Sequence, residues 1–129
     1  MELKKGIKGE VEITVAREYT ALEAGSGGVP VLATPMLVLL MEKAAIEALE
    51  GRVDQGQTTV GTALNIKHLA ATPIGMKVRA LARLEKVYLP RLFFRVEAFD
   101  EEEKVGEGEH QRFVIDRERF MEKVEAKGS

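Results

Sequence analysis

The chain has 129 residues, of which 45% are hydrophobic and 31% are charged, and this size and composition predict a single globular domain over residues 1–129. Its formal net charge of −2 gives no electrostatic reason to expect nucleic acid or an anionic membrane surface as a partner. It contains no cysteine, which excludes disulfides and thiolate chemistry, and no apolar run long enough to cross a bilayer. We therefore expect a cytoplasmic enzyme or binding protein.

The beginning of the chain predicts a strand followed by a glycine-rich loop. Apolar and polar residues alternate moderately over residues 7–15, which is the pattern of a half-buried strand. Residues 17–30 follow, and they carry a Gly-Ser-Gly-Gly segment at positions 25–28. We expect this loop to be mobile, and mobile loops often border binding sites.

One helix is predicted over residues 35–50. Thr34 is a favourable N-cap residue, Pro35 suits the first helical position, and Gly51 suits the position after the last turn. Residues 36–41 are apolar on nearly all sides of this helix. A helix of this kind is expected to be surrounded by protein.

Four strands joined by short turns are predicted after the helix, and a short polar helix closes the chain. The strands cover residues 58–69, 76–84, 92–99 and 104–115, and the last helix covers residues 116–127. Strands that follow one another in sequence normally pair antiparallel, and the one long apolar helix must cover a face of their sheet. The sequence therefore predicts an α+β fold, in which an antiparallel five-stranded sheet wraps around a central buried helix. This is the arrangement of the hotdog fold.

Two side chains of this arrangement are candidates for acid–base chemistry. Glu42 lies in the middle of the apolar helix, where a carboxylate without a partner costs on the order of several kcal/mol. It either has a function or turns to solvent or to a surface lysine. His68 ends a predicted strand and shares the parity of Val60, Leu64 and Ile66, so its imidazole should point toward the helix, where a purely structural role is the alternative. If the two side chains meet, Glu42 orients His68 and raises its basicity.

Three further residues, Thr34, Gly61 and Arg112, are candidates for binding or positioning. Thr34 could be only a helix cap, but its hydroxyl at the positive end of the helix could also bind a carbonyl, position water or attack. Gly61 interrupts a strand pattern, which predicts a bulge or a close ligand approach. His110 and Arg112 share a face of the last strand, where the arginine could pair with a carboxylate or phosphate, or both could lie on an exposed edge. No spacing typical of a metal site is present in the sequence.

Three segments resemble the fluoroacetyl-CoA thioesterase-like branch of the hotdog proteins, over about residues 31–120. They are residues 31–42, residues 61–76 around Gly-Thr-Ala and His-Leu-Ala-Ala-Thr-Pro, and residues 106–112. The resemblance implies an acyl-CoA thioesterase in which Thr34, Glu42 and His68 work together, while Gly61 and Arg112 contact the substrate. It also implies a homodimer with sites at the subunit interface. CoA would be part of the substrate and the leaving group, and no cofactor would be needed.

One segment departs from the family pattern. The fluoroacetyl-specific enzyme carries a phenylalanine in a lid before its helix, whereas residues 24–29 here contain no aromatic side chain. The sequence therefore predicts a different or broader choice of short acyl group. It leaves open a non-catalytic acyl-CoA-binding protein and a hotdog hydratase or dehydratase. It also leaves open whether Glu42 or Thr34 attacks the thioester directly or a water molecule is activated.

Overall fold

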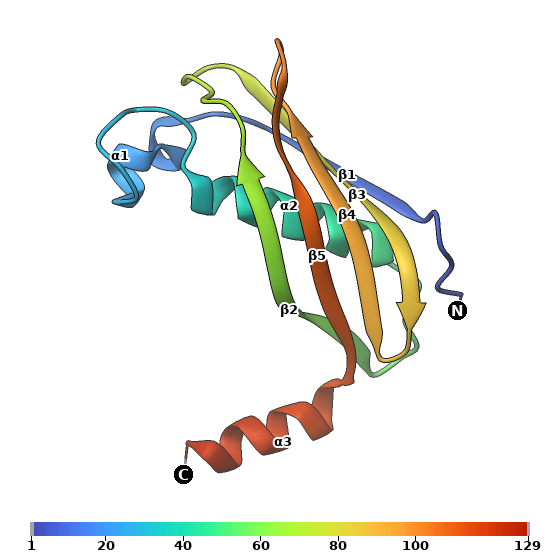
Figure 1. Ribbon diagram of the computed structural model, residues 1–129. Helices are drawn as coiled ribbons and strands as arrows, with labels where there is room; N and C mark the ends of the chain where they lie inside the picture. Colours follow the sequence, from blue (N-terminus) through green and yellow to red (C-terminus); the bar gives the residue numbers. More distant parts are fainter. Residues whose placement is uncertain (1, 129) are drawn as a thin grey trace.

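The computed structural model describes residues 2–128, in which a curled five-stranded antiparallel sheet holds one long helix against its concave face (Figure 1). The strands are β1 (Lys8–Thr14), β2 (Gln57–His68), β3 (Lys77–Tyr88), β4 (Arg91–Phe99) and β5 (Lys104–Asp116), and the helices are η1 (Arg17–Tyr19), α1 (Ala21–Ala24), α2 (Thr34–Leu49) and α3 (Arg117–Lys127). The strand order is β1-β3-β4-β5-β2, so β1 and β2 are the two edges of the sheet. The predicted sheet wrapped around a central helix is confirmed.

The core lies between the concave face of the sheet and α2. In β3 and β4 the buried side chains alternate with exposed or half-buried ones, as the sequence pattern predicts. The buried strand residues are Val78, Ala80, Ala82, Leu84, Leu92, Phe94, Val96 and Ala98, and they cluster with Leu37, Leu40, Met41, Ala44, Ala45 and Ala48 of α2. Burial of each of the larger side chains contributes about 1.5–3 kcal/mol, so this face is the main attachment of the helix to the sheet.

Two glycines allow α2 to approach the strands closely. A side chain at Gly9 of β1 would collide with backbone atoms of Ala44 and Ala48 in α2. A Cβ at Gly106 of β5 would come within 2.9 Å of the Leu37 side chain and 3.0 Å of the Met41 side chain. The helix therefore rests on the strand backbone at these points, which fixes its position over the sheet.

The start of α2 differs from the prediction. Ala33, with φ −71° and ψ 141°, occupies the N-cap position and makes no side-chain cap, and Thr34 is the first helical residue. The expected capping role of Thr34 is therefore wrong, and its hydroxyl has a different partner. At the other end of the helix, Gly51 has φ 73°, the left-handed conformation predicted for this position.

The segment predicted as a mobile loop, residues 17–30, contains η1 and α1 and is tied to the residues that follow. Backbone hydrogen bonds run from Ala21 N–H to Val31 C=O at 2.8 Å and from Leu22 N–H to Val29 C=O at 3.2 Å. Short helical turns were not predicted because the segment is too brief to show a hydrophobic period. The glycine-rich part is thus the closed tip of a hydrogen-bonded hairpin-like turn.

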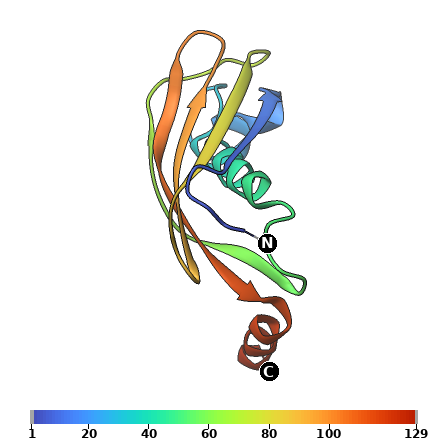
Figure 2. The same ribbon diagram turned by 90° about the vertical axis from the view of Figure 1, so that its right-hand side faces the viewer.

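One side of α2 is not covered by the rest of the described chain. Leu39 and Ile46 are 38% and 50% exposed, and Thr34 and Lys43 are exposed on the same helix. The expectation that protein surrounds this helix is wrong for a single chain. The reason is that the sheet curls over one side of α2 only, and β2 ends it as an open edge (Figure 2).

Helix α3 leads away from the sheet, as both views show (Figures 1 and 2). The Asp116 side chain caps its first turn by accepting a hydrogen bond from Arg119 N–H at 3.2 Å. The predicted polar helix at the end of the chain is confirmed. Among residues 2–128, no helix combines the length and the apolar character that crossing a bilayer requires.

The contact between Gly9 and α2 predicts a stability effect of one methyl group. Gly9→Ala should lower the free energy of unfolding by about 1–3 kcal/mol, because overpacking against a helix backbone cannot be relieved by a side-chain rotation. Chemical denaturation measures the change. Gly28→Ala is the matched control, because a Cβ there meets nothing within 4 Å. Equal stability of the two variants would contradict the close packing.

Candidate active site

The start of α2 meets the end of β2 in a direct hydrogen-bonded pair. The Thr34 hydroxyl lies 2.7 Å from Nδ1 of His68. Both residues border an open pocket of about 470 Å³, and its other lining residues are Ala21, Ser26, Gly27, Val29, Val31, Leu32, Leu69, Ala70 and Ala71. Most of the lining residues are apolar, and Ser26, Thr34 and His68 are the polar ones.

The imidazole of His68 is suited to move a proton. Burial lowers the pKa of His68 below its usual range, against a smaller opposing contribution from the backbone at Ala70. The ring is therefore neutral at neutral pH, and Nδ1 is the acceptor when the Thr34 hydroxyl donates. Its other nitrogen, Nε2, is buried and has no hydrogen-bond partner among the described residues.

A second polar cluster surrounds Gly61. The Glu42 carboxylate Oε2 lies 3.8 Å from Nη1 of Arg112. A Cβ on Gly61 would lie 2.8 Å from this carboxylate oxygen, 3.2 Å from Arg112 Nη1 and 3.3 Å from His110 Cε1. Side chains of the protein itself therefore approach Gly61 closely, and the approach of a ligand to Gly61 stays a prediction. Any larger residue at position 61 would displace the charged groups.

Arg112 is held in one orientation by several bonds. Its Nε donates to the Thr59 hydroxyl at 2.9 Å, and its Nη2 donates to the Thr59 carbonyl at 3.1 Å. Burial lowers the pKa of Arg112 and the Glu42 charge opposes this, but a guanidinium remains protonated in proteins. Arg112 is 5% exposed on an interior strand, so the alternative of an exposed edge is wrong.

A β-bulge in β2 brings Gly61 and His68 to the same face. Gly61 pairs with Arg112 and Ala63 pairs with Gln111, so Thr62 is the extra residue of the bulge. Gly61 and His68 are seven residues apart, and in a regular strand an odd separation would put them on opposite faces. The bulge reverses the alternation between them, which confirms the irregularity predicted at Gly61.

The same bulge corrects one part of the predicted alternation. Val60 pairs with Phe113, and residues directly opposite on neighbouring strands point to the same face. Phe113 has the parity opposite to the buried His110 and Arg112, so Val60 points away from α2 rather than toward it. Thr59 points inward instead. Uninterrupted alternation therefore predicts the wrong direction for Thr59. His110, for which no role was predicted, is 1% exposed and belongs to the cluster.

The two clusters are separate within one chain. Thr34 and Glu42 are eight residues apart on α2, which corresponds to about 12 Å along the helix axis. No hydrogen bond or ion pair joins Glu42 to His68 in residues 2–128. The structure therefore brings Thr34 to His68, and Glu42 to Gly61 and Arg112, but a single chain does not form the expected Glu42–His68 pair.

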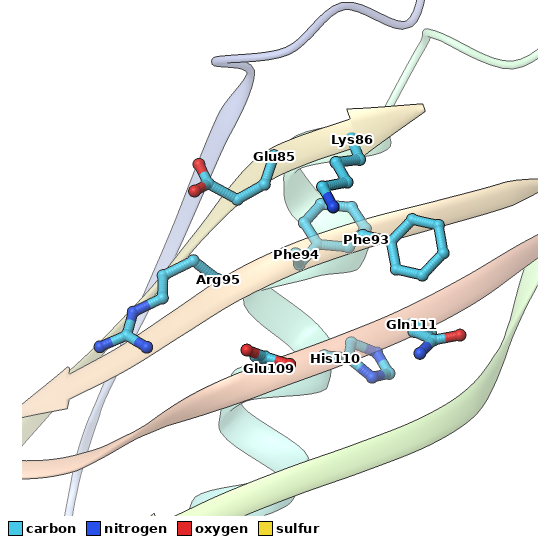
Figure 3. Close-up of a pocket in the computed structure, with 8 residues that line it drawn as sticks. All are labelled: Glu85, Lys86, Phe93, Phe94, Arg95, Glu109, His110 and Gln111. Atoms are coloured by element: carbon cyan, nitrogen blue, oxygen red, sulfur yellow. The ribbon is translucent and has the colours of Figure 1, made fainter. Parts of the chain in front are cut away.

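A different pocket, of about 230 Å³, lies on the outer side of the sheet, with α2 behind the strands (Figure 3). Its lining residues are Glu85, Lys86, Phe93, Phe94, Arg95, Glu109, His110 and Gln111. Acidic and basic side chains are mixed here, and none of the five predicted site residues lines it. In the part of the chain that the structure describes, no three His, Asp or Glu side chains gather closely enough to hold a metal ion.

Comparisons with known proteins show which family and fold this chain shares. Residues 15–118 match the family described as fluoroacetyl-CoA-specific thioesterase. The fluoroacetyl-CoA thioesterase of Streptantibioticus cattleyicolor is 41% identical over 97 residues, covering 75% of this chain and 70% of that protein. A crystal structure of a fluoroacetyl-CoA thioesterase superposes with a TM-score of 0.91 at 32% identity, covering 98% of both chains. A thioesterase superfamily member from Thermus thermophilus gives a TM-score of 0.88 at 28% identity, covering 98% of this chain and 96% of that one.

The fold and these matches together define a hotdog-fold thioesterase. The chain belongs to the fluoroacetyl-CoA-specific thioesterase family, as the three sequence segments predicted. It is therefore a thioester hydrolase.

The two histidines give a pH prediction. Burial lowers the pKa of His68 and of His110, so both rings should titrate below the ordinary value of about 6.5. As the pH falls below about 6.5, the unfolded chain binds protons before the folded one, so stability should fall with the pH over this range. Because the chain has only two histidines, imidazole NMR signals can follow each ring. His68→Gln and His110→Gln assign the signals, and a midpoint above 6.5 for either ring would contradict its burial.

Proposed function

We propose that this protein hydrolyses small acyl-CoA thioesters to a free acid and CoA, with Thr34, Glu42 and His68 as catalytic groups. The observation that carries the proposal is the 2.7 Å bond between the Thr34 hydroxyl and His68 Nδ1, beside a pocket lined mostly by apolar residues. Hydroxyl and imidazole within hydrogen-bond reach are the arrangement that general-base catalysis needs. The family membership supports the substrate class.

The reaction would proceed by addition to the thioester carbonyl. His68 takes a proton from the Thr34 hydroxyl or from a water molecule that this hydroxyl positions, and the oxygen adds to the carbonyl carbon. The positive end of α2 at Thr34 would stabilise the negative oxygen that forms. The Gly61 amide lies in the other cluster, so it would reach the same oxygen only from a second copy of the chain. His68 then returns the proton to the departing CoA sulfur. When water is the nucleophile, the free acid forms in this step. When Thr34 is the nucleophile, an acyl-Thr34 ester remains, and a water molecule activated by His68 hydrolyses it, so either route consumes one water and releases one acid and one thiol. Arg112 would contact the substrate from the Gly61 side, next to the Glu42 carboxylate with which it forms an ion pair.

We further propose that a second copy of the chain completes the site. The uncovered side of α2 carries Leu39 and Ile46, and β2 offers an open sheet edge beside it. Antiparallel pairing of two β2 edges would run two copies of α2 side by side in opposite directions. With the two-fold axis near Val38, Glu42 of the partner subunit would lie beside Thr34 and His68. This arrangement supplies the carboxylate that one chain does not bring to His68.

The acyl group would enter the pocket below the glycine-rich segment. Gly27 and Val29 line that pocket, and no aromatic side chain contributes to it. A broader or different choice of short acyl groups than fluoroacetyl alone is therefore proposed for the substrate. The absence of a cofactor and a cytoplasmic location stay predictions from the sequence.

The catalytic role of Glu42 is tested with two glutamate-to-glutamine variants, one at Glu42 and one at Glu50 just after the end of α2. Glu42→Gln should lower kcat by about 10²–10⁴-fold, because the carboxylate orients or assists the base, whereas Glu50→Gln should leave kcat unchanged. A thiol-trapping reagent measures CoA release from a panel of short acyl-CoA substrates. Undiminished turnover by Glu42→Gln would remove Glu42 from the mechanism. Binding without thiol release would favour a binding protein, and a change in enoyl absorbance would favour a hydratase.

The proposed dimer is tested through the uncovered side of α2. The wild type should have twice the 14.3 kDa mass of the chain by light scattering. Leu39→Glu should shift the protein to a monomer and abolish CoA release, because it places a charge in the apolar interface. Leu89→Glu is the control, because Leu89 is 67% exposed in the β3–β4 turn and belongs to neither α2 nor β2. A monomeric wild type with full activity would refute the shared site.

A further inference from the structure

His110 is a buried histidine that the proposed mechanism does not use. It lies in the middle of β5, is 1% exposed, and has the Phe94 ring beside it with 6.3 Å between ring centroids. The charged groups near it are Arg112 on its own strand and Glu42 on α2. A buried imidazole with both nitrogens bonded is a strong constraint on its neighbours, because each bond has a required direction.

Both nitrogens of His110 are bonded, and their partners select one state of the ring. Nδ1 lies 2.9 Å from the Ala63 carbonyl, which can only accept, so Nδ1 carries the proton. Nε2 lies 3.1 Å from Nη1 of Arg112, which can only donate, so Nε2 is unprotonated. The two contacts therefore require the same neutral tautomer, and a protonated ring would lose the second one. Burial also favours the neutral form.

The first of these bonds holds the β-bulge. Ala63 follows Thr62, the extra residue of β2, and the Thr62 hydroxyl also donates to the Gln111 carbonyl at 3.2 Å. The bulge is what turns both Gly61 and His68 toward α2. By donating to the Ala63 carbonyl, His110 attaches the bulge to an interior strand of the sheet.

The second bond completes the anchoring of Arg112. Nε and Nη2 are taken by Thr59, and one hydrogen of Nη1 is taken by His110. Nη1 also lies 3.8 Å from Oε2 of the Glu42 carboxylate, with which Arg112 forms an ion pair. A guanidinium fixed by three bonds has little freedom to follow another partner.

We propose that His110 is a positioning residue: its neutral ring fixes the Gly61 bulge through Ala63 and fixes Arg112 toward Glu42. This inference rests on the proposed function, since Glu42 and Gly61 act in that reaction. His110 touches no reacting atom and works through these two neighbours. One side chain thereby sets the relative place of the oxyanion donor and the carboxylate.

Two substitutions separate the two bonds. His110→Asn retains a donor at the place of Nδ1 but has no acceptor that reaches Arg112. His110→Gln retains an acceptor for Arg112 but has no donor at the place of Nδ1, within reach of the Ala63 carbonyl. His110→Asn should lower kcat by about 10- to 100-fold while KM changes little, because misplacement of a group by a fraction of an ångström costs turnover more than binding. Amide hydrogen exchange near Gly61 should become faster in His110→Gln and stay near the wild-type rate in His110→Asn.

A double-mutant cycle distinguishes positioning from general destabilisation. If His110→Asn acts through Arg112, adding it to Arg112→Gln should lower kcat no further, whereas independent losses would multiply. Val96→Ala is the control for stability, because this core residue of β4 is buried and makes no polar contact with the cluster. It should lower the unfolding midpoint with kcat retained.

An unchanged kcat in His110→Asn would overturn the inference, and so would losses of kcat that multiply in the double-mutant cycle. A third contrary result would be a loss of kcat in Val96→Ala as large as that in His110→Asn, because destabilisation alone would then explain both. The proposed function fails separately, if the wild type releases no thiol from any acyl-CoA in the panel. In that case the amide hydrogen exchange measurement decides the role of His110. Equal exchange rates near Gly61 in the wild type, His110→Asn and His110→Gln would refute that role.

Discussion

The packing of α2 directly on the strand backbone is the constraint on which the rest of the structure depends. Gly9 and Gly106 remove side chains from the contact, and alanines on the helix do the same from the other side. A helix held this closely has one position along the sheet. That position puts its first residue, Thr34, at the end of β2 and its middle, Glu42, at the bulge. The positions of both polar clusters are therefore determined by the apolar packing of α2 on the strands, which involves none of the polar side chains in those clusters.

The fold could be predicted from the sequence because its elements are strongly patterned. The alternation in β3 and β4 is nearly perfect, and Pro35 and Gly51 mark the ends of α2. These are local signals, and local signals are what a single sequence contains. The capping role expected for Thr34 was wrong because the neighbouring Ala33 already provides the non-helical residue and a tertiary partner, His68, takes the hydroxyl.

The candidate site could be predicted only in part. Thr34, Glu42, Gly61 and Arg112 stand out as polar or small residues in apolar or extended patterns, and the structure brings each of them to one of the two clusters. Thr59 could not be found, because its inward direction depends on a bulge whose effect on parity is not visible in the residue types. The separation of Glu42 from His68 also could not be foreseen. It depends on a distance along α2 and on what covers the open side of the helix.

The bulge at Thr62 also limits how β2 can change in length. Between Ala63 and His68, adding or removing a single residue would send the imidazole to the convex side of the sheet. Adding or removing two residues would keep the direction of the imidazole and only shift it along the strand. The same rule holds separately for the stretch that precedes Gly61. In this strand, viable insertions and deletions should come in even numbers on either side of position 62, so length variation among relatives is itself a record of which residues must face inward.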